Sequence, residues 1–430
     1  MNSQNPQRNQ KRPISSNKKP GYRRVKRKNG GIIGLFIIVF LLIIGLVSVI
    51  LCVNHSDNNT VTEVQPTQLT ETAVPETTAE PVVETKTVSF AAVGDNIMYE
   101  CNFTDAEDRA NEQYPEYNFT PIYTDILPQL QAADLAFINQ ETLMAGAEYG
   151  YSGYPCFNSP QALGDQLCEM GFDIVGMANN HMLDMGSVGI SDAIAFWKTK
   201  PVTMIGGYSD LTDYQTPRVV EKNGLKIAFL AYTYGTNGIT LSESSPVIIP
   251  YIDDELITED VKRAQAVSDC VVVSIHWGQE NVFTPNDDQT HVAQLLCDLG
   301  VNVILGSHPH VIQPICELTG VGGNKTLCIY SLGDFVATMA DEANMLGGVL
   351  SFNIVSDAKG IRVENVLFTP TVHHFGPSYY NSKLYYLSDY NDDLASILGN
   401  VYGINSSVAS LTSIVKDVMD PQYLPDYLKS

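Results

Sequence analysis

The chain of 430 residues carries a formal net charge of −23 at neutral pH. Residues 1–29 contain ten Lys and Arg and no acidic residue, so residues 30–430 carry −33. Nucleic-acid binding requires clustered basic side chains, and we therefore exclude nucleic acid as a partner. The acidic balance fits cation binding, or simply solubility.

Residues 30–53 contain no charged residue and are rich in Ile, Leu, Val and Phe. A run of this length can cross a bilayer core of about 30 Å as a helix. The basic segment precedes it, which predicts a cytoplasmic amino end and an extracellular remainder after Val53. A cleaved signal peptide is the alternative, but the run is too long and lacks a small-residue cleavage site. Leu51 before Cys52 also disfavours a lipoprotein signal. We predict a single-pass signal anchor in the cell membrane.

Residues 54–86 are rich in Thr, Glu, Pro and Val and contain no aromatic residue. Such a segment cannot bury enough apolar surface to offset the entropy of ordering it, so we expect a disordered stalk. Residues 87–375 alternate strand-like and helix-like runs, which predicts an α/β domain with a mixed sheet or two packed sheets. Residues 376–430 form a C-terminal extension with a helical pattern near 407–418 and no assignable chemistry.

Five predicted strands end in residues that could bind metal, in segments 91–95, 136–141, 174–181, 271–276 and 303–310. Ligands gather at the carboxyl ends of strands in open α/β sheets, so this repetition predicts one shared site. The candidate ligands are Asp95, Glu141, Asn180, His276, His308 and His310. Taken singly, each has an ordinary alternative, such as a turn Asp, a solvated Glu or a structural His.

His181 and Asp184 lie one helical turn apart, so the carboxylate can accept a proton from the imidazole and fix its tautomer. His308 and His310, separated by one residue, would project to the same side of an extended chain and suit one or two cations. Carboxylate and imidazole ligands fit Mn, Fe or Zn better than Ca. Two cations about 4 Å apart can activate water and stabilise the leaving oxygen of a phosphoester.

Motifs of other enzyme classes are missing from the sequence. Neither nucleotide-binding pattern, G-x-x-x-x-G-K-[ST] or G-x-G-x-x-G, occurs in the chain. The G-x-S-x-G elbow is also absent, which weakens a serine hydrolase interpretation.

Eight cysteines are present, and seven of them follow the apolar segment. Their spacing matches no zinc ribbon, and an odd number outside the cell leaves at least one free thiol or an intermolecular bond. Cys316 and Cys328 flank a Gly-rich turn at 319–325 between two apolar runs. A cross-strand disulfide there and a pair of free thiols are both open alternatives.

The ordered motifs resemble the CapA family of capsule or poly-γ-glutamate synthesis proteins, over residues 88–372. They are Gly94-Asp95, Asn139-Gln140-Glu141, Asn179-Asn180-His181 with Asp184 and Gly186, His276-Trp277-Gly278-Gln279-Glu280, Gly306-Ser307-His308-Pro309-His310 and Tyr330-Ser331-Leu332-Gly333-Asp334-Phe335. The resemblance implies a metallophosphatase-like four-layer α-β-β-α sandwich. It also implies a membrane-anchored external protein that works with a polymer synthase and exporter on an anionic polymer.

The resemblance extends to the wider calcineurin-like phosphoesterases and implies a role for each candidate. The implied roles are a first cation on Asp95 and His310, a bridging Glu141, a second cation on Asn180, His276 and His308, and a general acid, His181, oriented by Asp184. Two positions depart from the pattern. Ile97 occupies the histidine position of D-x-H, which removes a ligand of the first cation, and Asp334 replaces the Asn of S-L-G-N-F.

The leading hypothesis is an extracellular, membrane-anchored protein for synthesis, export or attachment of the polymer, with a metal-dependent hydrolase or transferase site. A non-catalytic scaffold or polymer-binding subunit of a synthase complex is the alternative, favoured by Ile97. A secreted phosphoesterase unrelated to polymer is a third hypothesis.

Overall fold

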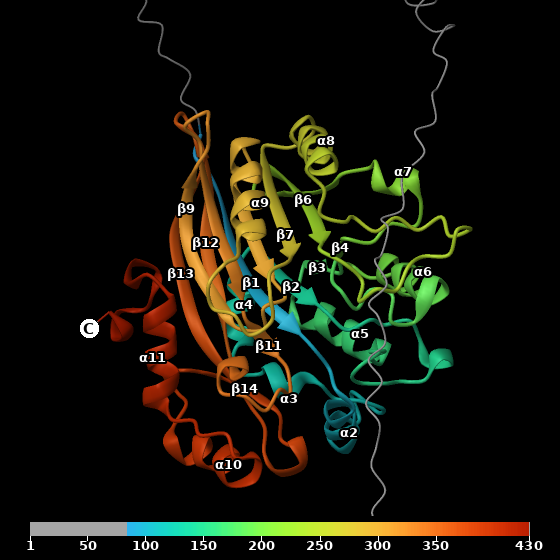
Figure 1. The fold of residues 1–430 in the computed structure, drawn as a ribbon, viewed down its shortest axis with the longest axis vertical. Coiled ribbons are helices and arrows are strands. Elements are labelled where there is room, and N and C mark those ends of the chain that lie inside the picture. The colour runs from blue at the N-terminus through green and yellow to red at the C-terminus, as the bar shows by residue number, and fades with distance from the viewer. Residues whose placement is uncertain (1–83, 430) are drawn as a thin grey trace, which may run out of the picture. The chain divides into compact units, whose positions relative to one another are not determined.

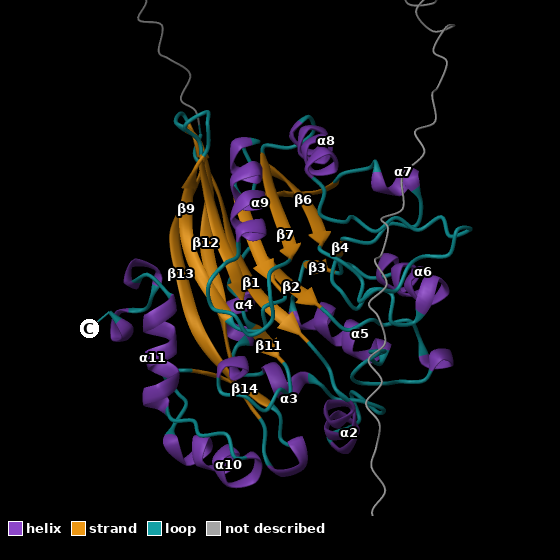
Figure 2. Ribbon diagram, in the orientation of Figure 1, coloured by secondary structure: helices purple, strands orange, loops and turns teal. Residues whose placement is uncertain are grey.

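The computed structural model describes residues 84–429 (Figure 1). The predicted basic segment and membrane span, and nearly all of the predicted stalk, lie outside this range. No helix within the described range is long and apolar enough to cross a membrane. The described residues form one eight-stranded and one six-stranded sheet with helices packed around them. Figure 2 distinguishes the helices from the strands by colour. The predicted α/β class with mixed sheets is confirmed.

The larger sheet has the strand order β14-β13-β12-β1-β2-β3-β4, with β11 pairing alongside β1. Strands β1 to β4 run parallel, and β12 to β14 add an antiparallel edge. The strands are β1 (Lys86–Asn96), β2 (Leu135–Gln140), β3 (Ile174–Gly176), β4 (Thr203–Ile205), β11 (Asp334–Val336), β12 (Leu346–Asp357), β13 (Gly360–His374) and β14 (Lys383–Tyr386).

The smaller sheet has the order β5-β6-β7-β8-β10-β9, with β6, β7, β8 and β10 parallel and an antiparallel strand at each edge. Its strands are β5 (Arg218–Lys222), β6 (Leu225–Thr233), β7 (Cys270–His276), β8 (Val303–Ser307), β9 (Ile312–Thr319) and β10 (Lys325–Leu332). Strand β7 is buried along its whole length, as expected for a parallel strand covered on both faces.

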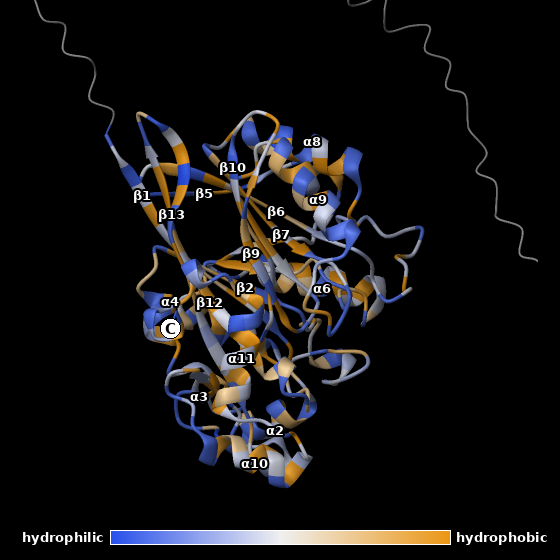
Figure 3. Ribbon diagram, turned by 60° about the vertical axis from the view of Figure 1, so that its left-hand side comes forward, coloured by the Kyte–Doolittle hydropathy of each residue, from blue (hydrophilic) through white to orange (hydrophobic). Residues whose placement is uncertain are grey.

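Successive side chains along a strand pack into hydrophobic cores on opposite faces of the sheet. In β1, Phe90 packs into the core between the two sheets, whereas Ala91 and Val93 pack on the opposite face. Phe229 of β6 lies in the inter-sheet core, with its ring centroid 6.1 Å from that of Phe90. This two-residue period follows from the pleat of the strand. In Figure 3 strands such as β6 and β7 are largely hydrophobic, whereas β13 and helices such as α8 and α10 carry both kinds of residue.

Helices cover the outer face of each sheet. Helices α3 to α6 pack on the larger sheet, and α8 and α9 pack on the smaller one. The helices are α2 (Glu100–Asp108), α3 (Thr120–Tyr123), α4 (Leu127–Gln131), α5 (Gln161–Met170), α6 (Gly186–Lys198), α7 (Leu211–Tyr214), α8 (Asp254–Gln265), α9 (Asp287–Asp298), α10 (Asp392–Tyr402) and α11 (Val408–Val418). Short 3-10 turns lie at Ala147–Tyr149, Ala343–Met345, Pro377–Tyr379, Pro421–Tyr423 and Asp426–Leu428.

The C-terminal extension packs on the domain core. Strand β14 extends the larger sheet, and Leu398, Leu411 and Val415 of α10 and α11 join the apolar cluster that contains Phe90 and Phe229. Helix α11 begins after Ser407, whose side chain accepts a hydrogen bond from the Ser410 amide, so the helical pattern seen in the sequence is a real helix.

Candidate functional site

The predicted ligands meet at one end of the two sheets. Asp95 lies within β1, Glu141 directly follows β2, and Asn180 follows β3 by a short loop. His276 ends β7 and His308 directly follows β8. Because these strands are parallel within their sheets, their carboxyl ends share an edge, and the two edges face each other across the site.

Two glycines let the backbones approach closely enough to place Asp95. A Cβ on Gly94 would lie 1.9 Å from the carbonyl oxygen of Gly333, and the Asp95 amide donates to that same oxygen at 3.0 Å. Gly333 itself has a φ of +72°, which favours glycine. In the resulting register, Asp95 lies opposite Asp334 of β11.

The backbone at the two histidines is bent, and the expectation of an extended chain there is wrong. His308 has a φ of +97° and His310 a φ of +57°, both in the left-handed region that non-glycine residues seldom adopt. The His308 amide donates to Oδ2 of Asp95 at 3.1 Å, which helps to hold this conformation. Strain of this kind concentrates at functional sites, where the surrounding structure enforces it.

Glu141 lies at the centre of the group without a hydrogen-bond partner. It is 1% exposed, and neither carboxylate oxygen is hydrogen-bonded within the described residues. Its Oε1 lies 3.7 Å from Nε2 of His276 and 3.8 Å from Nε2 of His310. Burial and the nearby Asp95 raise the pKa of Glu141 well above its usual value. An unsatisfied buried carboxylate is costly unless a cation or water completes its contacts.

His276 and His308 are held in the neutral form that can ligate a metal. Burial, together with the neighbouring His308 and His310 rings, lowers the pKa of His276 well below its usual value. Burial and His310 likewise lower the pKa of His308 to about 3. Nδ1 of His308 has no hydrogen-bond partner among the described residues. Nδ1 of His276 lies 2.9 Å from Oγ of Ser307, and its Nε2 lies 2.9 Å from Oδ1 of Asn180.

His310 differs from the other two rings because acidic groups surround it. Burial alone would lower its pKa, but Asp334, Glu141 and Asp95 outweigh burial and raise it well above the usual value. Nδ1 of His310 lies 3.0 Å from Oδ1 of Asp334 and 3.4 Å from Oδ2 of Asp95.

Two acidic residues belong to this region although they were not among the predicted ligands. Asp334 is fully buried, its Oδ2 has no hydrogen-bond partner among the described residues, and burial raises its pKa to about 7. Glu280 is exposed and offers an oxygen near His308 and His310. Both residues stand in the family motifs, but only the three-dimensional register shows Asp334 beside Asp95.

His181 and Asp184 form the predicted pair. Nδ1 of His181 lies 2.7 Å from Oδ2 of Asp184, and that oxygen also accepts from the Phe157 amide at 2.7 Å. The Phe157 ring meets the His181 ring edge to face, with centroids 4.7 Å apart. The carboxylate can therefore accept a hydrogen bond from Nδ1–H, which leaves Nε2 on the far side of the ring.

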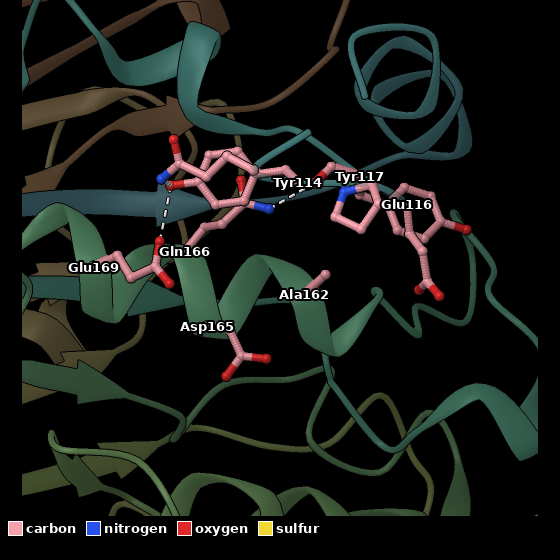
Figure 4. Close-up of a pocket in the computed structure, with 9 residues that line it drawn as sticks. Tyr114, Glu116, Tyr117, Ala162, Asp165, Gln166 and Glu169 are labelled. Atoms are coloured by element: carbon pink, nitrogen blue, oxygen red, sulfur yellow. Dashed lines mark hydrogen bonds between the residues drawn. The ribbon is translucent and has the colours of Figure 1, made fainter. Parts of the chain in front are cut away.

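A pocket of about 330 Å³ adjoins this pair and Asn180. Its lining residues are Tyr154, Pro155, Cys156, Asn180, His181, Asp184, Asn237, Ile239 and Glu280, and none of them is Lys or Arg. A second hollow, of about 210 Å³, lies elsewhere, between α5 and the loop around Tyr114 (Figure 4). There the Tyr114 hydroxyl donates to Glu169, and no histidine lines the wall.

The donor set fits a divalent cation. Three groups of side chains offer ligand atoms within 4.8 Å of one another: Asp95, Glu141 and His276; Asp95, His310 and Asp334; and Glu280, His308 and His310. Imidazole and carboxylate together suit Mn, Fe or Zn. The unpartnered oxygens of Glu141 and Asp334 and the free Nδ1 of His308 are the atoms that such an ion would satisfy.

Residues 89–339, more than half of the chain, match the family described as bacterial capsule synthesis protein PGA_cap. The chain belongs to this family. The resemblance to CapA proteins is thereby confirmed, and the PGA_cap region contains every candidate site residue.

Relatives of this PGA_cap chain include the PGA biosynthesis protein CapA of Bacillus subtilis (strain 168), 34% identical over 172 residues. That alignment covers 40% of this chain and 44% of the relative. The capsule biosynthesis protein CapA of Bacillus anthracis is 31% identical over 174 residues, which cover 39% and 41% of the two chains. The chain thus aligns with less than half the length of either relative.

A solved structure, the calcineurin-like phosphoesterase YfkN from Bacillus subtilis, aligns with 78% of this chain and 97% of its own. The sequence identity is 12% and the TM-score 0.39.

Proposed function

We propose that this PGA_cap protein takes part in the synthesis, export or attachment of an anionic capsule polymer, poly-γ-glutamate, through a metal-dependent hydrolase or transferase site of phosphoesterase type. The observation that carries the proposal is the buried, unpartnered Glu141 carboxylate between the histidines His276 and His310. A purely structural glutamate would have a hydrogen-bond donor or a basic partner.

Charge balance supports a bound cation. Asp95, Glu141 and Asp334 lie buried within one small cluster, and His310 is the basic side chain in it whose pKa is raised. The adjoining pocket supplies no Lys or Arg. An anionic substrate would be repelled from such a cluster, whereas a divalent cation would reverse the local charge.

The ligand assignment follows the geometry of the cluster. Asp95, Glu141, His276, His308 and His310 would hold the ion or ions, with Asn180 and Asp334 adjacent. A bound divalent cation would supply Lewis-acid polarisation of a phosphoryl oxygen and activation of water. For the Nε2 atom of His276 to act as a ligand, its proton must reside on Nδ1, where Oγ of Ser307 can accept it.

His181 would hold and donate the proton that the leaving oxygen requires. Asp184 fixes its ring through Nδ1, so Nε2 is the atom that would deliver the proton. The Phe157 amide holds Asp184 in turn, and the Phe157 ring limits rotation of the imidazole. These contacts support an acid whose orientation is set before substrate arrives.

The setting of the reaction is also part of the proposal. The uncharged segment 30–53 behind a basic amino end supports a signal anchor with residues 84–429 outside the cell. There the protein would meet the polymer and the membrane synthase or exporter. For the fold, we propose a relationship to the metallophosphatases, because helix layers lie outside two facing sheets.

A non-catalytic scaffold is the second candidate, and Ile97 favours it. Ile97 is 2% exposed and packs in a small apolar cluster with Phe157 and Ala337. The position two residues after Asp95 therefore contributes no ligand. In this version the site would bind a cation or polymer and organise a synthase complex without turnover.

Metal analysis and phosphoester hydrolysis by the purified full-length protein separate the two candidates. The enzyme version predicts bound transition metal and hydrolysis of bis(p-nitrophenyl) phosphate, with activity lost in His181→Ala and His308→Ala. His291→Ala is the matched control, because His291 is exposed and pairs with Asp254 away from the cluster. If no metal is bound and both site variants behave like wild type, the catalytic proposal is wrong. If polymer production in the cell requires His308 but the purified protein hydrolyses no substrate, the scaffold candidate is favoured.

A further inference from the structure

Cys316 and Cys328 lie directly opposite each other in the antiparallel β9–β10 hairpin. Directly opposed residues of antiparallel strands have Cα atoms about 4.5 to 5.5 Å apart and side chains on the same face. Disulfides require Cα atoms about 4.4 to 6.8 Å apart. We propose that Cys316 and Cys328 are an oxidisable dithiol that forms a disulfide across this hairpin, independently of the proposed metal chemistry.

The surroundings of the two thiols differ in the way that such a reaction needs. Cys316 is partly exposed, whereas Cys328 is fully buried against the core under α8 and α9. A hydrogen bond with Cys328 lowers the pKa of Cys316, although burial acts against it and Tyr330 assists. Burial and the adjacent Cys316 raise the pKa of Cys328 well above its usual value. Cys316 is thus the accessible thiol that ionises first.

The reaction balances with a small-molecule disulfide such as oxidised glutathione as the oxidant. The Cys316 thiolate attacks one glutathione sulfur, which breaks the glutathione S–S bond and releases one glutathione thiolate. Cys328 gives its proton to that thiolate and attacks Sγ of Cys316, releasing the second glutathione. Two protein thiols thereby lose two electrons and two protons, and one glutathione disulfide becomes two thiols.

The β9–β10 hairpin connects Cys316 and Cys328 to two residues of the candidate metal site. His310 lies just before β9 begins, and Asp334 lies just after β10 ends. These two residues meet at the open end of the hairpin, with Nδ1 of His310 3.0 Å from Oδ1 of Asp334. A covalent link at Cys316 and Cys328 would restrain both strands between the exposed turn and the site.

Peptide mapping of the purified full-length protein tests the proposal. The protein is equilibrated with reduced or oxidised glutathione, alkylated under denaturing conditions and digested. After oxidation we expect two fewer alkylated cysteines among the eight and a linked peptide containing Cys316 and Cys328. The melting temperature should rise by about 5 °C on oxidation, because the link restricts the unfolded chain. Dithiothreitol should reverse both changes.

Single variants show whether the pair itself is responsible. Cys316→Ser should abolish the linked peptide and the temperature shift, whereas Cys168→Ser, a partly buried thiol on α5, should keep both. The proposal is wrong if Cys316 and Cys328 are both fully alkylated after oxidation. It is equally wrong if the linked peptide joins either of them to Cys297, the buried thiol of neighbouring α9. Neither result depends on metal binding or turnover.

Discussion

Nδ1 of His310 lies 3.0 Å from Oδ1 of Asp334, across the open end of the β9–β10 hairpin. This contact fixes the ring so that its other nitrogen, Nε2, lies 3.8 Å from Oε1 of Glu141. A carboxylate that accepts a proton from one imidazole nitrogen commonly orients the other toward a metal ion. Asp334 therefore acts on the site at least through His310, and its unpartnered Oδ2 leaves it able to contribute directly.

Replacing Glu141 by Gln should have opposite effects on metal binding and on the metal-free fold. Affinity for Mn²⁺, measured by calorimetry, should fall by about 100-fold, because a charged ligand is lost. The metal-free protein should become more stable by about 1 kcal/mol, because a neutral amide avoids the cost of burying or protonating a carboxylate beside Asp95. Glu169→Gln, on the surface of α5, is the control and should change neither quantity. Unchanged affinity in Glu141→Gln would contradict the assignment.

The sequence predicted the convergence of the site because it depends on strand direction. Once Asp95, Glu141 and His276 are placed at the ends of parallel strands, their meeting follows from sheet geometry. The backbone at His308 could not be predicted in this way, because its positive φ depends on a tertiary hydrogen bond to Asp95. The position of Asp334 beside Asp95 likewise depends on the register between two strands far apart in the chain.

Replacing Asp184 by Asn should reduce turnover without removing metal. The amide can no longer accept and stabilise the proton on Nδ1 of His181 as a carboxylate does, so kcat should fall by roughly 100-fold. Metal content should stay at the wild-type level, because Asp184 belongs to no group of candidate ligands among the described residues. Measuring kcat and bound metal on the same samples tests whether Asp184→Asn lowers turnover while leaving the metal content unchanged. Loss of both together would instead indicate a role for Asp184 in holding the ligand cluster.

Gly94→Ala should destabilise the domain and weaken the site together. The added Cβ would lie 1.9 Å from the carbonyl oxygen of Gly333, so β1 must shift away and carry Asp95 with it. We expect a loss of about 2 to 3 kcal/mol in the free energy of unfolding, measured by urea denaturation. Gly235→Ala is the matched control, because a Cβ added there would have none of the described atoms within 4 Å beyond its chain neighbours. Equal stability of the two variants would show that β1 tolerates the displacement.

His373, which lies outside the candidate site, should make the free energy of unfolding depend on pH. Its Nε2 lies 2.6 Å from Oγ of Ser382 and its Nδ1 2.8 Å from the carbonyl oxygen of Ala337, and burial lowers its pKa from 6.5 to about 4. The unfolded chain therefore binds a proton between those values that the folded chain does not. This contribution to stability is present above pH 6.5 and is lost as the pH falls through 4, to a total of about 3 kcal/mol.

Urea denaturation between pH 7 and pH 4 tests this dependence in wild type, His373→Gln and the exposed-residue control His291→Gln. The difference in unfolding free energy between wild type and His373→Gln should narrow steadily as the pH falls. The control should change the pH dependence far less than His373→Gln does, because the contact between His291 and Asp254 is exposed to solvent. A difference that stays constant with pH would mean that His373 is protonated equally in both states.

Anomalous diffraction from crystals of the protein grown with Mn²⁺ tests the central claim most directly. The predicted result is at least one anomalous peak within coordinating distance of Glu141 and of two or more of His276, His308 and His310. No peak among these residues at saturating Mn²⁺, or a peak confined to exposed side chains such as the Asp254 and His291 pair, would contradict the metal site.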